Sequence, residues 1–236
     1  MKKLLSILIV LLPVLWGCKK TEKDKHIIEY GTVQDNDGQI ITTIKIGDQW
    51  WMAENLNSKR YQNGDSLITI STAEAATEWN KTNEGAYTFY NDSLFGYLYN
   101  YKAVEDPRKI APKGWRIPTD EDWKILEKHI GMNEEEANAF GWRGTKEANS
   151  LVSKFSKGWP ESSPLYGDDT YGFNAVPGGC ITLLNVINTG SNTAFWWTAS
   201  SENEEVYYRY IDYQQTRILR SKTSPKYGMS IRCIKE

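Results

Sequence analysis

The sequence predicts an α+β fold with short twisted antiparallel sheets, two or three helices packed to one side, and a long loop-rich region. Three observations support this. Strand-like patterns begin at Ile27 and return from Gly158 onward, whereas helical spacing is clearest between residues 119 and 154. Residues 57–113 are mostly irregular. Strands followed by helices and then by many short strands are typical of α+β domains.

The domain is expected to begin with a β-hairpin or meander. Strands are predicted at 30–33, 39–46 and 49–52, and the second alternates on one face through Ile40, Thr42, Ile44 and Ile46. The turn sequence Asp35-Asn36-Asp37-Gly38 separates the first two strands. It also looks like the first half of a calcium loop. The glutamate that such a loop needs further on is absent, so we favour a hairpin turn.

Capping residues predict where the helices begin. Ser71 and Thr119 are each followed three residues later by an acidic side chain, which is the capping-box spacing. They predict a short helix over 71–80 and a clear helix that ends at Gly131. Asn133 begins another helix, with the acidic residues 134–136 at its positive end, and a weaker helical piece covers 146–154.

Strands are expected to fill much of the remaining chain. Tyr97, Tyr99 and Tyr101 alternate, which predicts one face of a strand. The acidic run 202–205 is interpreted as a solvated loop, with calcium coordination as the alternative. Later strands are predicted at 171–177, 180–184, 194–200, 206–213, 216–220 and 228–234.

The first twenty residues have the features of a lipoprotein export signal. Lys2 and Lys3 precede an apolar run over 4–16, and Gly17 stands directly before Cys18. We therefore expect residues 1–17 to be a cleaved signal peptide, with lipid on the sulfur of Cys18. Residues 18–27 then form a polar tether, and residues 28–236 form a single domain. This predicts a cell-envelope protein held at a membrane by its N-terminal lipid.

The charge balance gives no reason to expect a nucleic-acid partner. The whole chain has 28 basic and 30 acidic residues. Loss of Lys2 and Lys3 with the signal peptide changes the net charge from −2 to −4. Such a chain has no basic field that would attract phosphates.

Two cysteines remain when Cys18 carries lipid. In an oxidising compartment Cys180 and Cys233 are a candidate disulfide. The alternative is a pair of buried free thiols, and only the geometry decides between them.

Aromatic side chains, at 13% of the chain, are abundant enough to suggest a binding surface. Trp and Tyr recur at binding hot spots, and adjacent Trp pairs on a strand place one ring on each face. The alternative is that these rings fill a loop-rich core. The candidates for ligand contact are Trp50, Trp51, Tyr97, Tyr99, Trp196, Trp197 and Tyr208.

The sequence carries no recognisable catalytic motif. His26 and His129 have no partner at a catalytic or metal-binding spacing, and nucleophile elbows, Walker loops and dinucleotide fingerprints are absent. Asp168-Asp169 and residues 134–136 could supply a carboxylate pair, but an acidic loop and a helix start explain them. We therefore expect no enzymatic activity, no metal and no cofactor, and calcium lacks a complete ligand set.

Six segments in fixed order carry a resemblance to a known family. They are Ile44–Leu56, Gly96–Tyr101, Ala111–Trp123, Gly172–Gly179, Phe195–Ser200 and Tyr227–Cys233. Together they resemble the Fibrobacter succinogenes major paralogous domain over about residues 28–236. The resemblance implies a C-type-lectin-like fold, similar also to formylglycine-generating enzymes. The resemblance implies neither the catalytic activity of those enzymes nor the sugar binding of true C-type lectins. The copper-binding cysteines of the enzymes and the sugar-binding tripeptides of the lectins have no counterpart here.

The resemblance also bears on the cysteines and on the membrane face. The family commonly has a cysteine before its Pro-x-Gly-Trp motif, paired with the one in the last strand, and this position is Ala111 here. We hypothesise that Cys180 replaces it as the partner of Cys233, which predicts adjacent strands. Export signals that direct lipoproteins to the outer surface carry acidic residues after the lipidated cysteine. Because Lys19-Lys20 stand there instead, the periplasmic face of the outer membrane is favoured over the cell surface.

These observations favour a lipid-anchored, non-enzymatic binding or structural domain that contacts glycan or protein. One alternative is a cell-envelope hydrolase or other enzyme that uses loop carboxylates, and another is a structural subunit of a surface assembly. Two carboxylates converging in a deep pocket would favour the enzyme, and a shallow aromatic patch would favour binding. An unpaired strand edge would favour the assembly.

Overall fold

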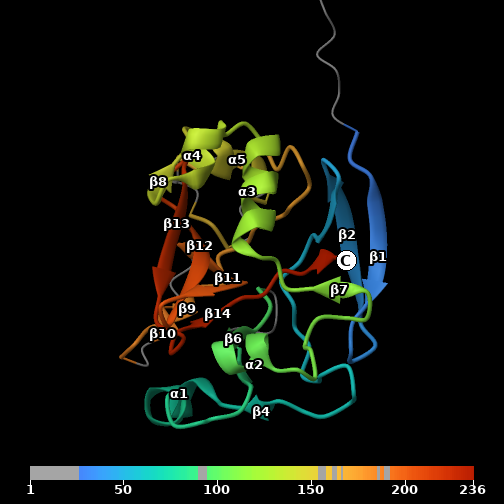
Figure 1. Cartoon of the computed structure of the whole chain (residues 1–236), viewed down its shortest axis with the longest axis vertical. Coiled ribbons are helices and arrows are strands. Elements are labelled where there is room, and N and C mark those ends of the chain that lie inside the picture. Colours follow the sequence, from blue (N-terminus) through green and yellow to red (C-terminus); the bar gives the residue numbers. More distant parts are fainter. Residues whose placement is uncertain are drawn as a thin grey trace, which may run out of the picture.

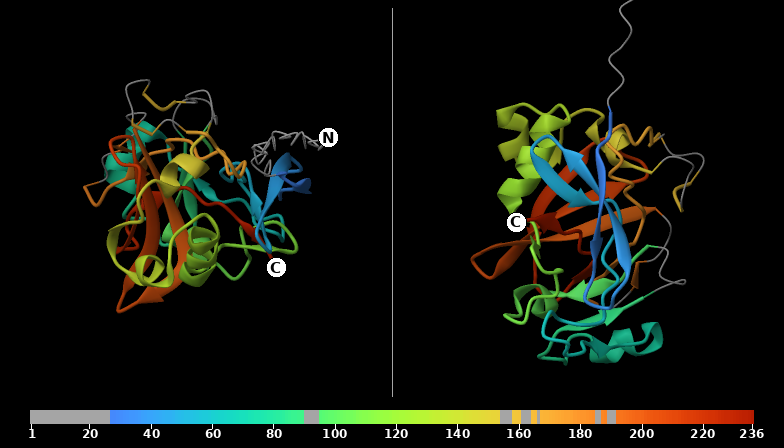
Figure 2. Two further views of the ribbon diagram at one scale, coloured as in Figure 1. Left: turned by 90° about the horizontal axis from the view of Figure 1, so that it is seen from above. Right: turned by 90° about the vertical axis from the view of Figure 1, so that its right-hand side faces the viewer.

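The computed structural model describes residues 27–89, 95–153, 158–160, 164–165, 167–184, 187–188 and 192–236. In this part of the chain the architecture is α+β, as predicted, with three mostly antiparallel sheets and a few short helices (Figure 1). Helices α3, α4 and α5, labelled in Figure 1, gather at one end of the molecule and α1 lies at the opposite end, and the right-hand view of Figure 2 shows the same separation.

The five-stranded sheet has the order β1-β2-β3-β15-β7. Its first three strands form the predicted antiparallel meander. The Asp35 carboxylate accepts hydrogen bonds from the backbone N–H groups of Asp37 and Gln39, at 2.9 and 2.8 Å, so this side chain stabilises the predicted turn. The strands are β1 (Tyr30–Gln34), β2 (Ile40–Ile46), β3 (Gln49–Met52), β7 (Trp115–Arg116) and β15 (Ile234–Lys235).

The other two sheets have the orders β10-β9-β14-β6-β5-β4 and β11-β12-β13-β8. All their strand pairs are antiparallel except β4 with β5. Asn203 and Glu204 both have positive φ, so the predicted loop over 202–205 is a tight hairpin turn. The strands are β4 (Ile68–Thr69), β5 (Ala86–Thr88), β6 (Leu98–Asn100), β8 (Gly141–Arg143), β9 (Cys180–Ile181), β10 (Ile187–Asn188), β11 (Thr193–Glu202), β12 (Glu205–Asp212), β13 (Ile218–Thr223) and β14 (Gly228–Met229).

Three helices begin at the predicted capping residues. Ser71, Thr119 and Asn133 each accept a hydrogen bond from the backbone N–H three residues later, and the acidic side chain there accepts one from the cap. The helices are α1 (Thr72–Glu78), α2 (Tyr101–Glu105), α3 (Asp120–His129), α4 (Glu134–Asn138) and α5 (Glu147–Leu151).

The structure corrects three local predictions. Tyr101 begins helix α2 instead of continuing a strand, because the side chain of Asn100 caps the helix by accepting from the Ala103 N–H at 3.1 Å. Residues 171–177 form a loop, since Gly172 and Asn174 have positive φ values that a strand does not allow. Residues 228–234 divide between β14 and β15, which belong to different sheets.

Aromatic rings fill the interior between the sheets and α3. Trp51, Trp123, Phe173 and Trp196 form one group, with neighbouring ring centroids 5.1–6.1 Å apart. Rings at these separations and tilted angles combine a large buried apolar area with favourable edge-to-face contacts. This group lies in one core cluster, and a second cluster contains Tyr99 and Trp197.

A buried ion network ties α3 to the four-stranded sheet. The Glu127 carboxylate, fully buried on α3, accepts hydrogen bonds from Arg143 at 2.7 and 2.8 Å and from Arg209 at 2.6 Å. Asp120, at the first turn of the same helix, accepts from Arg209 at 2.8 Å and from Arg220 at 2.7 Å. Three strands of the sheet thus contribute an arginine to two carboxylates of one helix.

This network predicts acid sensitivity through Asp120. Burial opposes its ionisation, but the hydrogen bonds and charges of Arg220 and Arg209 outweigh burial and lower the pKa of Asp120 to about 2. The unfolded state therefore takes up the proton first, and stability is lost as the pH falls from about 5 toward 2. We expect a loss on the order of 1–2 kcal/mol from this group, after allowance for solvent screening.

Urea unfolding of the wild type and of Asp120→Asn between pH 6 and pH 3 measures this loss. The variant, already destabilised at pH 6, should show the shallower dependence on pH. Equal slopes for the two proteins would contradict the assignment to Asp120.

Candidate functional site

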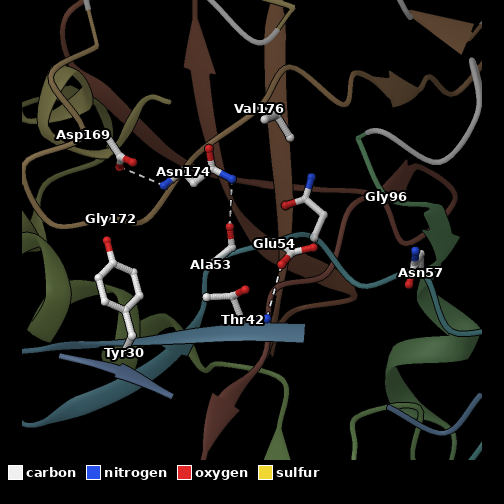
Figure 3. A pocket seen from close by; sticks show the side chains of 11 residues that line it. Tyr30, Thr42, Ala53, Glu54, Asn57, Gly96, Asp169, Gly172, Asn174 and Val176 are labelled. Atoms are coloured by element: carbon white, nitrogen blue, oxygen red, sulfur yellow. Dashed lines mark hydrogen bonds between the residues drawn. The ribbon is translucent and has the colours of Figure 1, made fainter. Parts of the chain in front are cut away.

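A polar pocket of about 460 Å³ lies beside β1 and β2 (Figure 3). One wall is the segment that follows β3, and the other is the loop between α5 and β9. Figure 3 shows Glu54 on the first wall and Asp169 with Asn174 on the second. The lining residues are Tyr30, Thr42, Ala53, Glu54, Asn55, Asn57, Gly96, Asp169, Gly172, Asn174 and Val176.

The first wall is fixed by its pairing with β2. The Thr42 N–H donates to the Glu54 carboxylate at 3.2 Å, and the Ala53 N–H donates to the Thr42 carbonyl at 2.9 Å. Gly96 closes this wall with a φ of +77°. A Cβ atom there would lie 2.5 Å from the Cβ of Asn55, so a larger residue would push the wall apart.

The second wall is a loop in an uncommon backbone conformation. Asp169 and Asn174 have φ values of 41° and 54°, in the left-handed region that non-glycine residues seldom adopt. The Asp169 carboxylate accepts from the Asn174 N–H at 2.8 Å, and the Asn174 side chain donates to the Ala53 carbonyl at 3.2 Å. These bonds hold the loop against the first wall and offset the strain of its backbone.

Arg232 connects the two walls from behind. Its guanidinium is fully buried and donates to the Asn55 side-chain oxygen at 2.8 and 3.1 Å, to the Phe173 carbonyl, and to the Asn174 carbonyl at 3.4 Å. Burial lowers the pKa of Arg232, whereas the charges of Asp169 and Glu54 act in the opposite direction. The pocket carboxylates are thus the counter-charges of a cation that does not reach the pocket surface.

The arrangement is suited to binding a small hydroxyl-rich molecule. The volume lies in the range of small-molecule sites, about 300–1,000 Å³. The lining supplies two carboxylates, several amides and two hydroxyl groups, which can accept or donate hydrogen bonds in several directions. Tyr30, 61% exposed on an edge strand, adds an aromatic face at the rim.

The structure corrects the predicted contact residues. Five of them are buried in the core, where hydrogen bonds or ring contacts occupy them: Trp51, Tyr97, Tyr99, Trp196 and Trp197. Strand alternation does separate each Trp pair, but Trp196 and Trp197 face two different core clusters. Trp50 and Tyr208 are half-buried, and neither lines the pocket.

The predicted disulfide is also corrected, since Cys180 and Cys233 are free buried thiols. Both belong to the second core cluster. Cys180 lies in β9, which pairs with β10 and β14, whereas Cys233 directly precedes β15, which pairs with β3 and β7. The expectation of adjacent strands is therefore wrong. Burial raises the pKa of the Cys180 thiol to about 12 and that of Cys233 further, which makes both poor nucleophiles.

The predicted export signal and the predicted lipidation site at Cys18 lie outside the described residues. Among the residues that are described, no helix is long and apolar enough to cross a membrane. Within the same part of the chain, no group of three or more His, Cys, Asp or Glu side chains is arranged to hold a metal ion. The two segments considered for calcium, 35–38 and 202–205, both form hairpin turns.

Sequence reasoning missed most of the pocket. The sequence pattern favours an acidic loop for Asp169, and it does not distinguish Tyr30, Glu54 and Asn174 as candidates for binding. A signal was nevertheless present, because Glu54 and Asn174 lie inside segments that carry the family resemblance. Their convergence depends on contacts between positions about 120 residues apart, such as the bond from Asn174 to Ala53.

A comparison with models of known protein families identifies the family of this chain. The model of the Fibrobacter succinogenes major domain matches residues 44–235, which include all six segments of the resemblance and most of the pocket lining. No curated protein and no solved structure matches the chain.

Proposed function

We propose a function for this chain, which belongs to the Fibrobacter succinogenes major domain family. It is a non-catalytic carbohydrate-binding protein of the cell envelope. The ligand would lie in the pocket between Glu54 and the loop that carries Asp169. The observation that carries the proposal is the polar lining of this pocket. Apolar ligands favour hydrophobic walls, whereas carboxylates, amides and hydroxyls are the partners that sugar hydroxyls need.

The place of the pocket in the family domain supports this proposal. Three segments of the resemblance meet there, since Ala53–Asn55, Gly96 and Gly172–Val176 all contribute to the walls. Arg232, from the closing segment, connects two of these walls. The segments that carry the family resemblance therefore form the pocket as well as part of the core.

A glycan array tests the proposal with two matched variants. The wild type should bind a defined set of glycans, and Glu54→Gln combined with Asp169→Asn should weaken that binding at least tenfold. Hydrogen bonds to charged groups contribute about 1.5–3 kcal/mol each, which supports an effect of this size. Glu135→Gln combined with Glu205→Gln removes two exposed carboxylates elsewhere and should leave binding unchanged. Empty arrays with folded wild-type protein would refute the proposal.

A hydrolase is the second candidate, because two carboxylates line the same pocket. Glycosidases use such a pair as acid and as base or nucleophile. Incubation of the wild type with every glycan that binds, followed by analysis of the products, separates the two functions. Cleavage that is lost in Glu54→Gln would establish the enzyme, and intact glycans would support binding alone.

We also propose a C-type-lectin-like scaffold. Its support is the contact between two segments of the resemblance, in which Trp196 is bridged to Ser230 and the Trp197 N–H donates to the Ser230 carbonyl at 3.1 Å. An experimental structure tests this, because a strand order unlike that of C-type lectins would reject it.

The proposed location is the periplasmic face of the outer membrane, through lipid on Cys18. Cys18→Ser should abolish incorporation of labelled palmitate and leave the protein uncleaved, because lipid is added to the cysteine sulfur before cleavage. Undiminished labelling of the variant would contradict lipidation at Cys18. Protease treatment of intact cells tests the face, since degradation would place the domain on the cell surface.

The alternative of a structural subunit has one observation in its favour. In the described chain β1 pairs only with β2, so its outer edge is open. An open edge can accept a strand from a partner. Cross-linking in whole cells that yields a defined complex through β1 would support this reading.

A further inference from the structure

We infer that the pocket selects a carbohydrate that carries a protonated amine, such as an amino sugar with a free amino group. This inference rests on the proposed function and names the class of ligand within it. Its basis is the sign of the charge that the pocket presents to a ligand.

The charged side chains of the lining are both carboxylates. Glu54 lies on one wall and Asp169 on the other, and the described lining includes no lysine, arginine or histidine. The Glu54 carboxylate accepts a hydrogen bond from the Thr42 N–H, and the Asp169 carboxylate accepts one from the Asn174 N–H, so both groups are held in place. An ammonium group between the walls would make charge-assisted hydrogen bonds, which are about twice as strong as neutral ones.

Arg232 does not reverse this sign. Its guanidinium is fully buried and donates to Asn55 and to the carbonyl groups of Phe173 and Asn174, so it cannot contact a ligand. One positive charge behind the wall leaves the pair of carboxylates with a net charge of −1. The surface of the pocket therefore attracts a cation and repels an anion.

The rim of the pocket also favours a sugar that carries a protonated amine. Tyr30 is 61% exposed, and Figure 3 shows its hydroxyl group directed toward Gly172, in the loop that forms the second wall. The face of a tyrosine ring attracts an ammonium group and offers an apolar surface to a sugar ring. A neutral sugar uses one of these properties and an amino sugar uses both.

Titration calorimetry with three oligosaccharides of equal length tests the inference. The full-length protein, in mild detergent at pH 6, is titrated with a glucosamine oligomer, its N-acetylated form and a uronic acid oligomer. We expect the free amine to bind at least tenfold more tightly than the N-acetylated form, and the uronic acid to bind most weakly. The preference should fall with added salt.

Variants locate the preference. Glu54→Gln and, separately, Asp169→Asn should each reduce the tenfold preference to less than threefold while the N-acetylated oligomer still binds. Equal affinity for the amine and its N-acetylated form in the wild type would overturn the inference and leave the proposed function standing. If none of the three binds, and the glycan array is empty as well, both proposals fall.

Discussion

Replacement of Glu127 by alanine is expected to lower the free energy of unfolding by about 3–5 kcal/mol. The variant removes the carboxylate that accepts hydrogen bonds from Arg143 and Arg209, both of them buried. The two guanidinium groups would keep their charge without that partner, in surroundings from which water is excluded. A desolvated charge without a partner costs more free energy than the ion pair contributes, which makes this one of the two largest losses expected in the fold.

Urea denaturation measures this effect. Glu121→Ala is the matched control, because Glu121 lies on the same helix but is exposed and forms its ion pair with Lys124, at 3.2 Å, near the surface. Its loss should be below about 1 kcal/mol. A Glu127 variant within 1 kcal/mol of the control would show that the buried network does not hold α3 to the sheet.

Replacement of Arg232 by alanine is expected to cost on the order of 3–5 kcal/mol and to abolish ligand binding. The Phe173 and Asn174 carbonyl groups would lose a buried donor, and the volume of the side chain would become a cavity. Removal of a desolvated charge offsets part of this cost. The loop that carries Asp169 would then be free to leave its left-handed conformation.

Arg232→Lys separates the positive charge from the geometry. Lysine keeps the charge, but its compact ammonium group cannot reach all three acceptors that the guanidinium fork spans. We expect Arg232→Lys to remain folded with binding weakened at least tenfold, as measured by calorimetry with a glycan that binds the wild type. Unchanged binding in a folded Arg232→Lys variant would show that the pocket does not depend on this connection.

The local elements of this fold could be predicted where one short sequence decides the structure. The helix starts at Ser71, Thr119 and Asn133 depend on a hydrogen bond between residues three positions apart, and all three are present. The turn over 35–38 is likewise held by its own aspartate. The hairpin between β11 and β12 depends on two consecutive residues, Asn203 and Glu204, that adopt positive φ.

Predictions failed where distant contacts decide the structure. Trp196 has the same local pattern as an exposed strand aromatic, but contacts with Trp123 and Phe173 bury it completely. Residues 171–177 are predicted to form a strand. Arg232, about 58 residues away, instead holds the carbonyl of Asn174 in a loop. The pocket follows from that loop, so its residues could not be derived from the sequence pattern alone.

Locating the ligand on the protein tests the proposed pocket most directly. A glycan found by the array, fitted with a photoactivatable group, is cross-linked to the full-length protein and the modified residues are identified by mass spectrometry. We expect modification on residues 53–57 and 169–176 that an excess of free glycan suppresses. Suppressible modification confined to another surface, such as the half-buried rings of Trp142 and Tyr210 on the four-stranded sheet, would contradict it.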